Sequence, residues 1–187
     1  MSRTAIALVH HPCVDKKGEV YTTSITNLDV HDIARSSRTF GVDTYYIVTP
    51  IQAQKELAQT IAAFWDEGPG RDRNRDRQEA LRTLHVVDNL EEAIEREKSL
   101  VGTKPVVLAT SAKETSDNIT FSEARQEIAA HEGALILFGT GYGLADAALQ
   151  RADHIVEPVR GRCDDYNHLS VRSAAAIILD RLLTPTR

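Results

Sequence analysis

Residues 134–144 read ALILFGTGYGL, an apolar run that ends in three glycines at alternate positions. The apolar residues predict a buried β-strand over Ala134–Phe138 that runs directly into a tight turn. Glycine lets the backbone approach a ligand closely because it carries no Cβ. The glycine spacing differs from the GxGxxG fingerprint of dinucleotide-binding folds, so the turn alone does not identify a ligand.

Short apolar runs and segments of helical periodicity alternate on both sides of this stretch. We expect strands at Thr4–Val9, Thr44–Val48, Leu84–Val87, Pro105–Ala109, Ala134–Phe138 and His154–Val156. We expect helices at Asn27–Thr39, Gln52–Trp65, Leu90–Leu100, Ser122–Ala130, Asp146–Arg151 and Ser170–Leu183. This alternation predicts an α/β fold with a mostly parallel sheet and helices on both faces.

The composition is typical of a globular protein: 187 residues, 42% hydrophobic and 26% charged. We therefore expect a single domain over residues 1–187. No apolar run approaches the roughly 20 residues of a membrane helix, and the first residues lack a signal-peptide pattern. Two cysteines, Cys13 and Cys163, are too few for disulfide bonds to stabilise a domain of this size. We expect a cytoplasmic protein that does not bind membranes.

The net charge of −5 argues against non-specific binding of phosphates over the whole surface. One basic segment stands out: Asp66–Arg77, DEGPGRDRNRDR, which we expect to form a surface loop. Its charges fit either a solvated loop or an RNA contact, because arginine pairs with phosphate through a planar fork. The arginines concerned are Arg71, Arg73, Arg75 and Arg77.

In parallel α/β sheets, ligands bind beyond the carboxyl ends of the strands, so the residues that follow each strand are candidates for a site. After the first strand come His10 and His11, followed by Cys13. Adjacent histidines in a strand point to opposite faces, and no second cluster has the spacing of metal ligands, so we expect no metal. The later strands are followed by Thr110–Ala112, the glycine turn and the loop that begins at Glu157.

Three motifs, in order, resemble those of the SPOUT class of S-adenosylmethionine-dependent RNA methyltransferases, in particular its small bacterial members related to the SpoU/TrmH ribose methyltransferases. The first is Asn27–Gly41 (NLDVHDIARSSRTFG), a helix bearing Arg35. The second is Leu135–Leu144 (LILFGTGYGL). The third combines Glu157–Gly161 (EPVRG) with Leu169–Ile177 (LSVRSAAAI).

The motifs depart from those of the ribose methyltransferases at several positions. Asp29 and His31 stand where those enzymes usually have Asn and Gly, and Ser170 stands where they have Asn. The second motif also lacks their glutamate. These departures leave open whether a ribose oxygen or a base nitrogen is methylated, and whether the RNA is a tRNA or an rRNA.

The resemblance implies a C-terminal trefoil knot within Ala134–Leu183, a homodimer, an RNA substrate and S-adenosylmethionine as the cofactor. It also implies that backbone groups of three loops hold the cofactor. The residues implied are Thr110, Ser111, Ala112, Gly139, Thr140, Gly141, Gly143, Glu157, Pro158, Val159, Gly161, Asn167, His168, Leu169 and Ser170.

The resemblance also assigns a catalytic role to Arg35. The pKa of an arginine side chain exceeds about 12, so the guanidinium stays protonated and cannot serve as a base. It can instead hold a phosphate or stabilise a developing oxyanion. Asp29, His31 and Asp32 precede it on the same helix and are candidate proton acceptors. Three alternatives stay open: the acids only complement the helix dipole, the protein is a non-catalytic relative that binds RNA or a nucleotide, or it is an unrelated doubly wound enzyme such as a small hydrolase.

Overall fold

The computed structural model describes residues 2–162 and 166–184, so Cys163 lies outside the described residues. The elements in chain order are β1 (Arg3–Val9), β2 (Cys13–Val14), β3 (Val20–Tyr21), α1 (Asn27–Thr39), β4 (Thr44–Val48), α2 (Gln52–Asp66), α3 (Arg75–Leu81), β5 (Leu84–Val87), α4 (Leu90–Val101), β6 (Val106–Thr110), β7 (Asn118–Ile119), α5 (Phe121–Ala130), β8 (Gly133–Gly139), α6 (Asp146–Leu149), β9 (His154–Val156) and α7 (Val171–Leu183).

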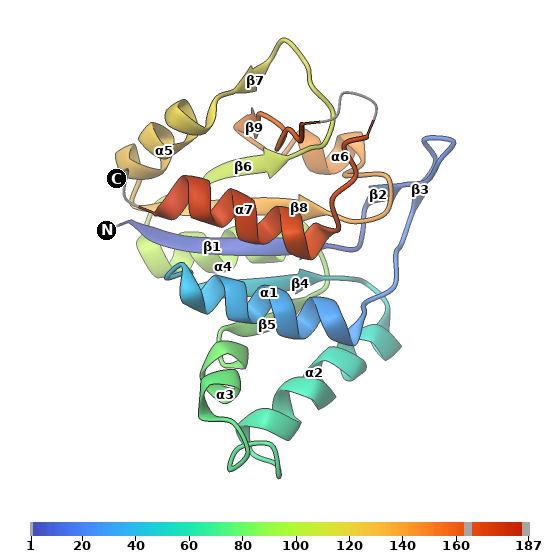
Figure 1. Ribbon diagram of the computed structural model, residues 1–187, viewed down its shortest axis with the longest axis vertical. Coiled ribbons are helices and arrows are strands. Elements are labelled where there is room, and N and C mark those ends of the chain that lie inside the picture. Colours follow the sequence, from blue (N-terminus) through green and yellow to red (C-terminus); the bar gives the residue numbers. More distant parts are fainter. Residues whose placement is uncertain (1, 163–165, 185–187) are drawn as a thin grey trace.

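Seven strands form one sheet in the order β5-β4-β1-β8-β6-β9-β7, and every pairing in it is parallel. In Figure 1, α1, α5 and α7 lie in front of this sheet and α4 lies behind it. The predicted α/β fold with a mostly parallel sheet is confirmed. Parallel strands end at a common edge, so β1, β6 and β8 bring their carboxyl ends together.

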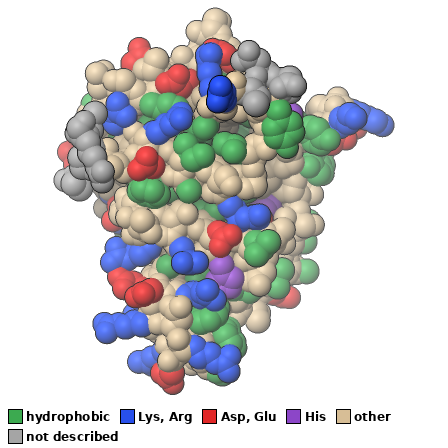
Figure 2. Space-filling view, in the orientation of Figure 1, with side chains coloured by type: hydrophobic (Ala, Val, Ile, Leu, Met, Phe, Trp, Pro, Cys, Tyr) green, Lys and Arg blue, Asp and Glu red, His purple; other side chains and the backbone are tan. Residues whose placement is uncertain are grey.

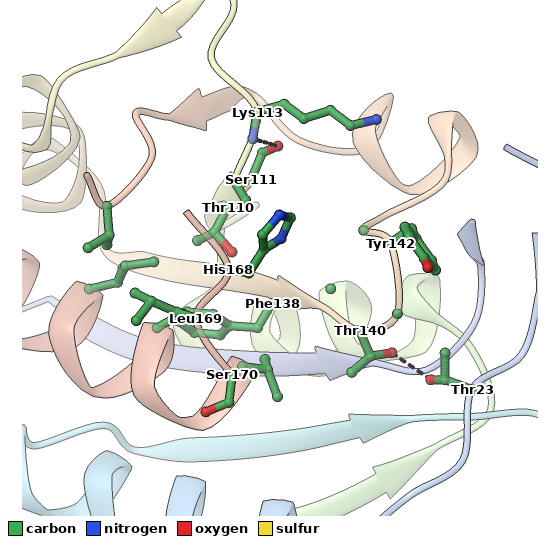
Figure 3. A pocket seen from close by; sticks show the side chains of 18 of the residues that line it. Thr23, Thr110, Ser111, Lys113, Phe138, Thr140, Tyr142, His168, Leu169 and Ser170 are labelled. Carbon is green, nitrogen blue, oxygen red and sulfur yellow. Dashed lines mark hydrogen bonds between the residues drawn. The ribbon is translucent and has the colours of Figure 1, made fainter. Parts of the chain in front are cut away.

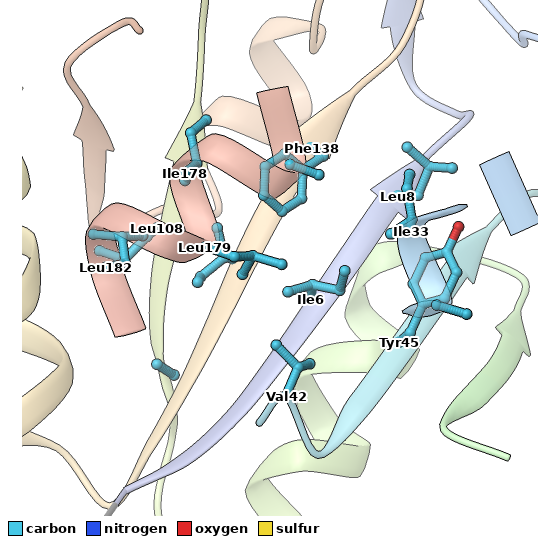
Figure 4. Packing of buried hydrophobic residues seen from close by; sticks show 14 of the residues in the cluster. Ile6, Leu8, Ile33, Val42, Tyr45, Leu108, Phe138, Ile178, Leu179 and Leu182 are labelled. Carbon is cyan, nitrogen blue, oxygen red and sulfur yellow. The ribbon is translucent and has the colours of Figure 1, made fainter. Parts of the chain in front are cut away.

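Successive side chains of β1 point to opposite faces of the sheet, so they belong to two separate parts of the core. Ile6 and Leu8 belong to one cluster with side chains of α1 and α7, whereas Ala5, Ala7 and Val9 belong to a second cluster with α4. Figure 4 shows the first cluster between the sheet and the two helices. Since both faces are covered, the functional surface is confined to the strand ends and the outer faces of the helices.

All twelve predicted elements are present, with shifts of one or two residues at their ends. The hairpin of β2 and β3, the short strand β7 and the helix α3 were not predicted. Two-residue strands are too short to leave a periodic signal in the sequence. No described helix has the length and hydrophobicity needed to cross a membrane.

The prediction that Asp66–Arg77 is a surface loop is wrong at both ends. Helix α2 continues to Asp66, and α3 begins at Arg75. Asn74 caps α3 by accepting a hydrogen bond from the Arg77 backbone N–H at 2.9 Å. The apolar residues that bury α3, Ala80 and Leu81, lie beyond the charged segment. The first turn of α3 therefore consists of charged and polar residues, which give no apolar periodicity in the sequence.

Candidate active site

A cavity of about 1130 Å³ opens at the carboxyl ends of β6 and β8 (Figure 3). Its walls come from the segment before α1, the loops after β6 and β8, and the segment that leads into α7. They combine hydroxyl groups with apolar side chains. The lining residues are Thr23, Ser24, Asp29, Thr110–Lys113, Phe138–Gly143, Val159, Asn167–Val171, Ala174 and Ile178.

The glycine turn after β8 follows one wall of the cavity and is tightly packed. A Cβ on Gly139 would lie 2.9 Å from the backbone nitrogen of Leu144. Gly141 and Gly143 have φ angles of +63° and +114°, which other residues rarely adopt. Two backbone hydrogen bonds, from Tyr142 N–H to Val14 O and from Gly143 N–H to Thr140 O, hold the turn. The turn therefore brings bare backbone to the cavity.

A chain of hydrogen bonds joins this turn to the segment before α1. Thr23 Oγ1 lies 2.5 Å from Thr140 Oγ1 and 2.8 Å from Nδ1 of His10 (Figure 3 shows the threonine pair). Thr140 in turn donates to Val9 O at 3.0 Å. Burial lowers the pKa of His10 to about 4, so its ring is neutral at physiological pH. The neutral histidine fixes the position of two hydroxyls in the cavity wall.

Asp29 is the acidic side chain of the cavity wall, and its two oxygens are both engaged. Oδ2 accepts a hydrogen bond from Thr26 Oγ1 at 2.7 Å, and Oδ1 accepts one from Arg172 Nη1 at 2.9 Å. Asp29 is only 5% exposed, so the arginine compensates a buried carboxylate. Arg172 also lies 3.5 Å from Asp32 and thereby ties α7 to α1.

The structure brings together most of the predicted cofactor residues. Those that line the cavity are Thr110, Ser111, Ala112, Gly139, Thr140, Gly141, Gly143, Val159, Asn167, His168, Leu169 and Ser170. Glu157, Pro158 and Gly161 do not line it. The Glu157 carboxylate accepts a hydrogen bond from the Phe121 backbone N–H at 2.8 Å, so it holds the start of α5 in place.

The three predicted catalytic residues separate into two groups. Asp29 lines the cavity, whereas His31 and Arg35 line a second, smaller cleft between α1, α2 and α3. Burial, with Arg77 and Arg35 adding to the effect, lowers the pKa of His31 below its ordinary value.

Sequence reasoning missed the segment Thr23–Ser24 and the pair of Asp29 with Arg172. The segment gives a weak signal, since it contains two hydroxyl residues just before a helix that carries a recognised motif. His10 and His11 hydrogen-bond to Thr23 and Thr22. Within residues 2–162 and 166–184, no three His, Cys, Asp or Glu side chains cluster in a way that would hold a metal ion.

Comparison with protein families gives a match to SAM-dependent RNA methyltransferases over residues 3–184. The chain belongs to this family. The resemblance to S-adenosylmethionine-dependent RNA methyltransferases that was drawn from the three motifs is thereby confirmed at the level of the family.

Two relatives differ in how much of their length this chain matches. A protein of Oleidesulfovibrio alaskensis named tRNA (guanine-N(1)-)-methyltransferase is 47% identical over 177 residues, which are 95% of this chain and 41% of the relative. The chain thus spans about two fifths of that relative's length. An uncharacterized protein of Aquifex aeolicus is 40% identical over 183 residues, which are 97% of this chain and 89% of the relative.

Solved structures share the fold at low sequence identity. A probable methylase family protein from Haemophilus influenzae is 18% identical, with a TM-score of 0.65 over 97% of this chain and 65% of its own. The TrmH/SpoU tRNA modifying enzyme of Aquifex aeolicus is 14% identical, with a TM-score of 0.61 over 98% of this chain and 75% of its own. These similarities establish the fold of this chain.

Proposed function

We propose that the protein transfers methyl groups from S-adenosylmethionine to RNA and that it binds this cofactor in the cavity at the ends of β6 and β8. The observation that supports this is the convergence of three loops, distant in sequence, on one cavity of about 1130 Å³. Val159 and Leu169 offer apolar surface for an adenine ring, while the bare turn Gly139–Gly143 offers backbone groups to a ribose. Glu157, Pro158 and Gly161 then act by shaping the loop that carries Val159.

The bound cofactor supplies a sulfonium methyl group, which is a strong electrophile. The protein has to place an oxygen or nitrogen of the RNA in line with that methyl group and to help remove a proton. We assign Asp29 as the candidate proton acceptor in the cavity, where Thr26 and Arg172 fix its orientation. His31 and Arg35, outside the cavity, are assigned to holding and orienting the RNA.

Titration calorimetry with S-adenosylmethionine and with its demethylated product tests this site. We expect one binding event per chain for each ligand, and we expect the thermal unfolding midpoint to rise with ligand concentration. The absence of both heat and stabilisation at millimolar ligand would exclude the proposed cofactor site.

The relatives' names support tRNA as the RNA, and the protein would then act in the cytoplasm. Transfer of a labelled methyl group from S-adenosylmethionine to unfractionated tRNA tests this assignment. The guanine N1 activity named for the Oleidesulfovibrio alaskensis relative is not carried over to this chain, because more than half of that protein lies outside the matched region. Transfer of the labelled methyl group to rRNA but not to tRNA would contradict the assignment.

We further propose that Ala134–Leu183 forms a trefoil knot within a single domain over residues 1–187. In the sheet, β9 lies between β6 and β7, which are directly joined by the loop 111–117. The chain leaving β9 must pass this loop to reach α7. Passing through it would produce the knot that the SPOUT resemblance implies, an exception to the usual absence of threading. An experimental structure in which residues 157–170 run outside the loop would contradict the knot.

A homodimer is the proposed assembly. The apolar stripe of α7 is buried within the chain through Ala175, Ile178 and Leu179, so it is not available for a partner. Tyr166, which is 67% exposed, lies next to α7 and offers apolar surface for an isologous contact. Light scattering at micromolar concentration is expected to give twice the chain mass of 20.7 kDa, and a monomer would contradict the dimer.

Basic residues around the α2–α3 turn are proposed to grip the RNA. Arg71, Arg73 and Arg75 are exposed, and Arg77 is half-buried. Replacing all four by serine is expected to weaken RNA binding and to lower the slope of log Kd against log salt by roughly one for each phosphate that the variant no longer binds. Binding titrations at several salt concentrations measure both quantities.

In the control variant, four exposed cationic side chains elsewhere on the protein are replaced, so that its net charge changes by the same amount. Serine replaces Arg96, Lys98, Lys104 and Arg151. If both variants lose the same affinity and slope, the effect is one of overall charge, and the α2–α3 turn has no special role in binding.

A further inference from the structure

The second cleft, called here the α1–α2 cleft, is separate from the cofactor cavity. It has a volume of about 610 Å³ and shares no lining residue with that cavity. Its lining residues are Asn27, Leu28, His31, Asp32, Arg35, Thr60, Ile61, Phe64, Trp65 and Arg77. None of these residues takes part in the proposed cofactor site.

Aromatic rings and a guanidinium group pack against one another in this cleft. The ring of Trp65 lies edge-to-face with both Phe64, at 5.3 Å, and His31, at 5.8 Å. The guanidinium carbon of Arg77 lies 4.7 Å from the centre of the Trp65 ring. Phe64 is 39% exposed and Leu28 is 57% exposed. Unstacked RNA bases bind to such aromatic and guanidinium planes.

Several polar atoms of the cleft lack an internal partner. Among the residues described, His31 Nδ1 and Arg77 Nε are buried without a hydrogen bond. In the same part of the chain, the Arg35 guanidinium forms no ion pair. Buried polar groups are normally satisfied, so these atoms point to a ligand with polar groups.

The charge of the cleft favours RNA over a second copy of this chain. Arg35 and Arg77 face one acid, Asp32, which is already near Arg172 at 3.5 Å. Figure 2 shows further basic side chains around the lower part of this face, where α1, α2 and α3 lie. In a two-fold contact this cleft would face its own copy, so Arg35 and Arg77 would meet the same arginines, whereas the phosphates of RNA carry the opposite charge.

The cleft and the cavity meet at the first turn of α1. Leu28 lines the cleft, and its neighbour Asp29 lines the cavity. A single RNA strand can therefore present one nucleotide to the cavity and another to the cleft. This arrangement would hold the strand on both sides of α1.

We propose that the α1–α2 cleft binds an unstacked nucleotide of the RNA substrate, outside the methyl-transfer site. The base stacks against Phe64, Trp65 and the Arg77 guanidinium, while Arg35 and Arg77 pair with phosphate oxygens. His31 supplies Nδ1 as a hydrogen-bonding group to the base. This inference rests on the proposed RNA substrate and adds the mode by which that RNA is recognised.

Trp65 is the single tryptophan of the chain, so its fluorescence reports directly on the cleft. Titration with unfractionated tRNA and with a short single-stranded RNA of mixed sequence is expected to quench it, because a base stacks on or beside the ring. Trp65→Ala is expected to weaken binding of the same RNAs by about fivefold or more. Phe64→Ser, at an exposed position, is expected to weaken it in the same direction without disturbing the core.

The matched control is Arg38→Ser on the same helix, since Arg38 is exposed, pairs with Glu79 and does not line the cleft. Unchanged fluorescence with RNA, together with unchanged affinity in the Phe64→Ser variant, would overturn the proposal. So would loss of a dimer in the Phe64→Ser variant, because the cleft would then be an interface between copies. Calorimetry with S-adenosylmethionine is read separately: if the cofactor fails to bind while RNA still quenches Trp65, only the proposed cofactor site fails.

Discussion

Replacing Arg35 by alanine is expected to lower the rate of methyl transfer to RNA about a hundredfold, because the reacting RNA atom is then no longer held in position. Cofactor affinity is expected to stay unchanged, because Arg35 lines the α1–α2 cleft and not the cofactor cavity. The measurements are the transfer rate from labelled S-adenosylmethionine and calorimetry with the same cofactor on the same variant.

The physical reason is that Arg35 holds the RNA in a reactive position. Its exposed guanidinium is free to make two parallel hydrogen bonds to a phosphate, and misplacement of the acceptor by even about 1 Å costs about two orders of magnitude in rate. Arg35→Lys is expected to recover little of the activity, since an ammonium cannot reproduce the planar fork.

Arg38→Ala is the matched control for this prediction. It removes an arginine from the same helix, three residues further on, where the side chain pairs with Glu79. Full activity in a folded Arg35→Ala protein would exclude the role in transfer. Folding and oligomeric state are measured on the same samples, because loss of the dimer would assign Arg35 to assembly and not to the reaction.

The sequence predicts the sheet and much of the cavity for one physical reason. Parallel strands end at one edge, so residues that follow strands far apart in sequence, such as Thr110 and Gly139, meet in space. The prediction needs only the strand positions, and those are strongly marked by apolar runs such as Ala134–Phe138.

Other parts of the site depend on contacts that no local pattern encodes. Asp29 pairs with Arg172, which lies 143 positions away in the sequence. Arg35 follows Asp29 by six residues, or about one and two-thirds helical turns, so the two side chains leave α1 in different directions. A motif on one helix thus becomes two separate surfaces, which only the packing of α7 and α2 against α1 reveals.

Replacing Gly139 by alanine is expected to weaken S-adenosylmethionine binding by about tenfold to a hundredfold, through displacement of the turn that lines the cavity. The added Cβ would lie 2.9 Å from the backbone nitrogen and 3.0 Å from Cγ of Leu144. Leu144 is 7% exposed and bridges to Cys13, so it has little room to move away. The turn itself must shift, and the backbone groups that face the cofactor shift with it.

Gly102→Ala separates this effect from a general loss of stability. Gly102 ends α4 with a φ of +83°, and a Cβ at this position would have no atom within 4 Å, so alanine there costs about 1 kcal/mol of strain. We expect Gly102→Ala to unfold at a lower temperature and to bind the cofactor as tightly as the unmodified protein. Gly139→Ala, by contrast, should lose affinity at temperatures where it is fully folded. Calorimetry and thermal unfolding on both variants decide the matter, and full cofactor affinity in folded Gly139→Ala would show that the turn is not part of the cofactor site.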